Sequence, residues 1–166
     1  MRPRRLVIAA VAVAVGLGGV ADARSGGTLD GSRRRSFSYD GDLTGTTLPQ
    51  QAVAGRDYPR PSDCGETDCD VTTLRLTVPR GRQSGRLDYV IRFDHSLSAE
   101  VALYDAADRE VRRAESREVE IDSYTMRLSV TRLRPGRYTI VVYAAAGSGS
   151  FQATAQWRVN PPHRTS

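Results

Sequence analysis

The sequence predicts an all-β protein: a β-sandwich of jelly-roll or Ig-like type with seven to eight antiparallel strands, preceded by a signal-peptide helix. Two observations predict the sandwich. From residue 36 onward, apolar side chains alternate with polar ones, which is the two-residue period of half-buried strands. The alternating segments are short and are separated by turn residues, such as Pro135-Gly136 and the Gly/Ser run at 147–150. Many short strands at this spacing are typical of two packed sheets.

The expected strands follow one another along the chain. They span residues 36–43, 71–78, 86–93, 99–105, 124–133, 137–145 and 151–159. In the second of them, for example, Leu74 and Leu76 face the core and Arg75 faces outward. The charged segment 106–121 has too thin an apolar stripe to dock as a helix, so we expect a hairpin or an edge strand there.

The first 23 residues have the three regions of a cleavable secretory signal peptide. Arginines precede an apolar stretch at 6–15, and the segment ends in the small-x-small sequence of Ala21 and Ala23. Cleavage after Ala23 makes Arg24 the first mature residue. A retained anchor would need about 20 apolar residues, and glycines interrupt this run. We therefore expect a secreted, extracellular protein with no membrane anchor after cleavage; the choice between general and twin-arginine export stays open.

The mature chain divides into three parts. Residues 24–35 are rich in Gly, Ser and Arg without periodicity, so a disordered leader is expected there. The β-sandwich domain is expected over 36–160, followed by a flexible tail at 161–166. We expect one domain and a monomer.

The charge of the chain argues against nucleic acid as a partner. The formal net charge of +5 falls to +3 without residues 1–23, which carry three Arg and one Asp. The remaining charges are interspersed. The one basic run, at 33–35, could bind anionic surface polymers or nucleic acid, but a solvated segment is the simpler interpretation.

The two cysteines, Cys64 and Cys69, are expected to form a disulfide, because they are close in sequence and an exported chain meets an oxidising environment. A loop this short gains roughly 2 kcal/mol by the chain-entropy estimate. A redox CxxC motif is missing, and zinc would need four ligands.

Acidic residues cluster around this bridge. They are Asp63, Glu66, Asp68 and Asp70. Calcium takes six to eight oxygen ligands from irregular loops, so a calcium site is one hypothesis. The alternative, which we prefer, is that they are solvated turn acids. No other cofactor is expected.

The sequence argues against an enzyme. Only His95 and His163 could supply an imidazole base; His95 stands at a strand-to-turn junction and His163 in the tail. Nucleophile-elbow, zinc-protease and phosphate-loop motifs are missing from the sequence. A small hydrolase with paired carboxylates is the least favoured class.

Four segments resemble the bacterial pre-peptidase C-terminal domain, a β-sandwich often appended to secreted proteases. They are LRLTVP (74–79), LDYVIRF (87–93), VALYD (101–105) and LRPGRYTIVV (133–142). The last is similar to the family's Gly-x-Tyr-x-Val-x-Val strand. Residues 98–100 read Ser-Ala-Glu where members often have Asp and Leu, so acidic ligands are not carried over there. The resemblance covers 36–159 and implies a non-catalytic accessory module, here expected to stand alone behind its signal peptide.

These observations favour a non-catalytic module that binds an extracellular protein or polysaccharide. Sugar recognition uses exposed aromatic side chains, and Tyr104 and Tyr143 fall on the outward parity of their strands. Packing against a second layer is the alternative for both tyrosines, and it is the interpretation that we prefer. The second class of function is an accessory or structural envelope protein, or a partner of a separately encoded secreted peptidase.

Overall fold

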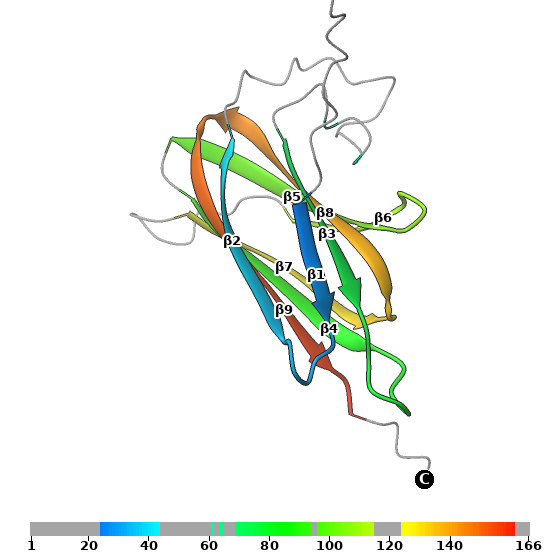
Figure 1. Cartoon of the computed structure of the whole chain (residues 1–166). Helices are drawn as coiled ribbons and strands as arrows, with labels where there is room; N and C mark the ends of the chain where they lie inside the picture. The colour runs from blue at the N-terminus through cyan, green and yellow to red at the C-terminus, as the bar shows by residue number, and fades with distance from the viewer. Residues whose placement is uncertain are drawn as a thin grey trace, which may run out of the picture.

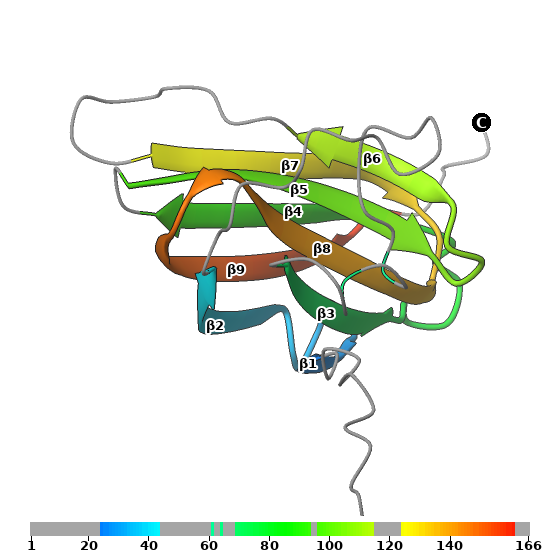
Figure 2. The same cartoon turned by 90° about the horizontal axis from the view of Figure 1, so that it is seen from above.

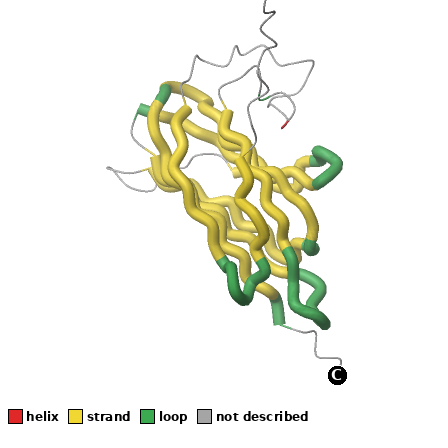
Figure 3. Tube along the Cα trace, viewed as in Figure 1, coloured by secondary structure: helices red, strands yellow, loops and turns green. Residues whose placement is uncertain are grey.

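The computed structural model describes residues 24–43, 61, 64, 69–93, 96–114 and 124–161. Nine β-strands account for most of this part of the chain, and Figure 3 draws them in yellow. They are β1 (Arg24–Leu29), β2 (Ser36–Leu43), β3 (Cys69–Leu76), β4 (Gly85–Phe93), β5 (Leu97–Asp105), β6 (Glu110–Ala114), β7 (Tyr124–Leu133), β8 (Gly136–Gly147) and β9 (Gly149–Val159).

The strands form two sheets packed face to face, so the predicted β-sandwich is confirmed (Figures 1 and 2). One sheet has five strands in the order β1-β3-β8-β5-β6, and the other has four in the order β2-β9-β4-β7. Within the described residues there are thus nine strands, one more than the upper end of the expected range. All pairs are antiparallel except β1 with β3, which is parallel.

The core lies between the two sheets and contains the side chains that the alternation pointed inward. The largest fully buried ones include Trp157, Tyr89, Leu74 and Ile140. The indole N–H of Trp157 donates to the carbonyl oxygen of Thr77 at 2.8 Å, which satisfies its one polar atom inside the core. A Cβ on Gly85 would lie 2.5 Å from the Trp157 ring, so only glycine lets the ring pack there.

The prediction of a disordered leader at 24–35 was wrong. Arg24–Leu29 forms β1, whose Leu29 is fully buried. The connection to β2 is also ordered: the side chain of Asp30 accepts hydrogen bonds from the backbone N–H groups of Ser32, Arg33 and Arg34. These backbone bonds lower the pKa of Asp30. Pairing with β3, rather than local periodicity, makes this segment a strand.

The expected edge segment within 106–121 is present as β6, which pairs with β5. The turn between them is closed by Asp105, which accepts hydrogen bonds from the backbone N–H groups of Ala107 and Arg109. In the part of the chain that the structure describes, no helix has the length and apolar character needed to traverse a membrane.

Candidate binding surface

The outer face of the five-stranded sheet differs from its core face, because it carries a polar groove at one end and an apolar cluster at the other. Its side chains come mainly from β3, β8 and β5, the neighbours that lie side by side in Figure 2. The register fixes which of them meet. Arg75 lies directly opposite Arg137, Val71 opposite Val141, and Tyr104 opposite Thr139.

At the first end an open hollow of about 720 Å³ crosses β1, β3 and β8; we call it the arginine groove. Its lining residues are Ser25, Gly27, Thr28, Thr73, Arg75, Leu76, Thr77, Pro135, Gly136 and Arg137. The register of β1 on β3 places Thr28 beside Arg75 and Ser25 beside Thr73. Short hydroxyl side chains therefore surround the two arginines.

The arginine pair sets the electrostatics of the groove. Like charges that face one another across an antiparallel pair are destabilising. Both Arg75 and Arg137 are exposed, so water screens much of this repulsion. Among the described residues, no carboxylate forms an ion pair with either guanidinium. The groove is therefore a locally cationic surface.

A third guanidinium, that of Arg34, lies next to the lining residue Gly27 and 5.8 Å from the centre of the Phe37 ring. The Nη1 atom of Arg34 is 2.8 Å from the position that a Cβ on Gly27 would occupy. Gly27 has a φ of +71°, a conformation that L side chains rarely adopt. Glycine at this position thus leaves the space that Arg34 fills.

The other end of the face is covered, and this corrects the prediction of ligand-facing aromatics. Tyr104 is 3% exposed and Tyr143 only 1%. They belong to the tyrosine cluster, whose members are Cys64, Val71, Ala102, Tyr104, Val141 and Tyr143, with Cys69 packed against it. The outward parity was right, but both rings are buried in this cluster, so neither ring is available to a ligand.

Tyr143 is also held through its hydroxyl group. It donates a hydrogen bond to the carboxylate of Glu100 and accepts one from Arg113 at 3.3 Å. Burial, together with the adjacent Glu100 carboxylate, raises the pKa of Tyr143 well above its ordinary value, although Arg113 opposes this shift. The hydroxyl therefore stays protonated and donating at neutral pH.

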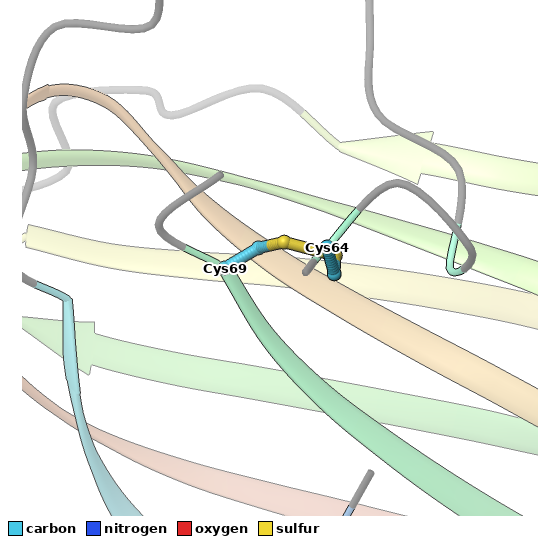
Figure 4. The surroundings of a disulfide bond; sticks show 2 residues. All are labelled: Cys64 and Cys69. Atoms are coloured by element: carbon cyan, nitrogen blue, oxygen red, sulfur yellow. A yellow bond between two sulfur atoms is a disulfide. The ribbon is translucent and has the colours of Figure 1, made fainter. Parts of the chain in front are cut away.

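The predicted disulfide between Cys64 and Cys69 is confirmed (Figure 4). Cys69 begins β3, and Cys64 is 3% exposed within the tyrosine cluster. The bridge thus ties Cys64, a buried member of the tyrosine cluster, to the first residue of β3.

Of the four acids considered for calcium, only Asp70 lies among the described residues. Its carboxylate is 3.3 Å from the guanidinium of Arg24 and accepts a hydrogen bond from the Thr72 hydroxyl. Asp70 is thus engaged by its own chain. Asp63, Glu66 and Asp68 lie outside the described residues, and within the described part no group of three metal-ligating side chains comes together.

Asp70 belongs to a polar network at the edge of the core. The Arg24 guanidinium lies 4.3 Å from the centre of the Tyr39 ring, and the Tyr39 hydroxyl is 2.6 Å from that of Tyr89. Burial raises the pKa of both tyrosines, and the negative charge of Asp70 adds to the shift. The residue expected to begin the mature chain therefore forms part of the folded sandwich.

The remaining sequence candidates lie outside the described residues: His95, His163, Ala21 and Ala23. The arginine groove was not predicted. Arg75 was recognised as outward-facing, but its register against Arg137, and the presence of β1, could not be read from local periodicity. The basic run at 33–35 was the one sequence signal near it.

Comparison with known proteins gives similarities of fold. No protein-family model and no curated protein sequence matches the chain. Among solved structures, the pre-peptidase C-terminal domain of a collagenase from Bacillus anthracis aligns over 81% of this chain and 95% of that one, with 14% identity and a TM-score of 0.48. The chain is similar to a pre-peptidase C-terminal domain. The sequence segments resemble the same domain type.

A second similar structure is CorA, a surface-associated copper-binding protein important in copper acquisition by Methylomicrobium album BG8. It aligns over 83% of this chain and 99% of that one, with 9% identity and a TM-score of 0.43.

Proposed function

We propose that this chain is an exported, non-catalytic β-sandwich module that binds a polysaccharide or a protein at the cell surface or outside the cell. The observation that carries the proposal is the arginine groove, an open hollow with hydroxyl and guanidinium donors on the outer face of a sheet. Strands hold these donors in fixed register, which lowers the ordering cost of binding.

The chemistry of the groove supports binding rather than catalysis. Among the described residues, its lining includes Ser and Thr hydroxyls but no His, Cys, Asp or Glu. A hydroxyl nucleophile needs a neighbouring base to be activated. The groove therefore offers hydrogen bonds and positive charge without a proton acceptor of suitable pKa.

Two features support export. The first 23 residues have the layout of a signal peptide, and the Cys64–Cys69 bridge belongs to a class of bond that persists in oxidising compartments. The module is proposed to act as a monomer.

The test uses residues 24–166, purified with the disulfide intact. The folded chain is applied to a glycan array and, immobilised, to solubilised cell-envelope material. Retention of at least one glycan class or of one envelope protein at micromolar concentration is expected. The same chain after heat unfolding is the control for adhesion by charge alone. Retention of nothing, or equal retention by the unfolded chain, would overturn the proposal.

A further inference from the structure

We propose that the arginine groove binds an anionic polysaccharide, through oxyanion groups that insert between Arg75 and Arg137. This rests on the proposed function and names its ligand class. The two residues are direct partners across β3 and β8, so their Cα atoms are about 4.5–5.5 Å apart. Both guanidiniums therefore reach one oxyanion, or two neighbouring ones.

An oxyanion would remove an unfavourable feature of the free protein. The facing guanidiniums repel one another, and no described carboxylate neutralises either. A phosphate or carboxylate between them replaces this repulsion with charge-assisted hydrogen bonds, which are shorter and stronger than neutral ones. The planar guanidinium fork suits both groups.

The rest of the lining suits the sugar or polyol part of such a polymer. Hydroxyl groups of Ser25, Thr28, Thr73 and Thr77 surround the arginines, and each can both donate and accept hydrogen bonds. Gly27 and Gly136 add no side chains that would fill the hollow. A hydrated chain carrying many hydroxyls can therefore lie across the strands.

The positive charge continues beyond the pair. Arg34, from the connection between β1 and β2, approaches the lining residue Gly27, and its guanidinium lies over the Phe37 ring. A polymer that repeats its oxyanions can place one between the central pair and another near Arg34. The proposed ligand is therefore a polymer whose oxyanions repeat along its length.

Other macromolecules fit the groove less well. Single-stranded nucleic acid is held by stacking on aromatic rings, and the lining residues that the structure describes include no aromatic side chain. Peptides use main-chain pairing or apolar pockets. The apolar lining side chains are Leu76 and Pro135, and Leu76 is only 1% exposed. These differences favour a polysaccharide.

The test compares two double variants of residues 24–166 that lose the same charge. Arg75→Gln/Arg137→Gln alters the groove. Arg92→Gln/Arg127→Gln alters exposed arginines on the outer face of the four-stranded sheet and is the matched control. Thermal melts verify that both variants fold. The immobilised probes are polygalacturonate for carboxylates, a phosphomannan for phosphates, neutral dextran, and an oligothymidylate for nucleic acid.

We expect wild type to bind one or both anionic glycans more tightly than dextran and oligothymidylate. The groove variant should lose at least tenfold in affinity and show a weaker salt dependence, and the control should stay within twofold. Arg34→Gln should lower the affinity by a smaller factor. The carboxylate and phosphate arms identify the oxyanion.

Three outcomes would overturn the inference: equal losses in both double variants, preferential binding of oligothymidylate, or retention only of dextran or an envelope protein. In the last case the proposed function stands and only the ligand class fails. If the wild type retains none of the probes and no envelope material, both fail together.

Discussion

The two ends of the outer face of the five-stranded sheet share the strands β3 and β8, yet they differ in exposure and in charge. At one end Tyr143 is buried against Cys64 and Val141. At the other end Arg75 and Arg137 are exposed around an open hollow. Strand alternation places Tyr143, Val141, Arg75 and Arg137 on the same side of the sheet. What differs is their burial: Tyr143 and Val141 pack with Cys64, and the two arginines are exposed.

The comparison shows that an outward parity does not mean exposure. The buried side chains of the covered end stabilise the fold, whereas the arginines of the open end are exposed and can contact another molecule. Four expectations follow from this difference: three concern the covered end and one concerns the open end.

The largest effect is expected for Tyr143→Ala. Removing a buried aromatic ring costs its burial and leaves a cavity, so we expect a loss of about 3 kcal/mol in the free energy of unfolding, measured by urea melts. Tyr143→Phe keeps the ring and loses only the hydroxyl contacts, so a loss of about 1 kcal/mol is expected. A cost below 1 kcal/mol for the alanine variant would mean that the tyrosine cluster is not packed.

Removing the disulfide is expected to have the next largest effect. Cys64→Ala/Cys69→Ala should lower the free energy of unfolding by roughly 2 kcal/mol. It should also raise iodide quenching of tyrosine fluorescence, because Cys64 packs in the tyrosine cluster. Wild type reduced with a thiol is the control and should behave alike. Unchanged quenching in both the variant and the reduced wild type would show that the bridge does not keep the tyrosine cluster buried.

The covered end should also make stability fall at alkaline pH. The folded-state pKa of Tyr143 is raised by burial above its ordinary value of 10.0. Its contribution is therefore complete below about pH 10 and is lost as pH rises above that value toward the folded-state pKa. Urea melts between pH 9 and 11.5 should show a steep decline that is shallower in Tyr143→Phe.

The groove variant supplies the control for this titration. Arginine stays charged throughout this range, so Arg75→Gln/Arg137→Gln should keep the wild-type decline with pH. A wild-type free energy of unfolding that does not change up to pH 11.5 would contradict the burial of the Tyr143 hydroxyl.

The smallest effect on stability is expected at the open end. Arg75→Gln/Arg137→Gln should change the free energy of unfolding by less than about 0.5 kcal/mol. The sign should be stabilising at low salt, because the repulsion between the facing guanidiniums disappears. Melts at low and high salt measure this difference. A loss above 1 kcal/mol would show that the arginines support the fold rather than a ligand.

Much of the fold could be predicted because its strands carry their own pattern. The strand Ser36–Leu43 has the predicted bounds, and the alternation in Gly85–Phe93 correctly placed Leu87, Tyr89 and Ile91 in the core. The strand Arg24–Leu29 was missed because its sequence, RSGGTL, carries one large apolar side chain and two glycines. Such a segment has little preference of its own and becomes a strand through its partner.

The candidate site depended on information of another kind. The disulfide was predictable from cysteine spacing and the signal sequence, and it is present. Asp70 was grouped with the turn acids by sequence proximity, but in the fold it pairs with Arg24, which lies 46 residues earlier in the chain. Contacts at this distance along the chain follow from strand order, which local patterns do not encode.

The sequence by itself therefore determined the sandwich, most of its strands, the side of the sheet to which each side chain points, and the cysteine pair. All of these follow from short-range periodicity and spacing. The tertiary structure alone decided that Arg24–Leu29 joins a sheet, that Arg75 faces Arg137, and that Tyr104 and Tyr143 are covered. The physical reason is that register and coverage arise from the packing of distant segments. A local pattern fixes the direction of a side chain but not what it meets there.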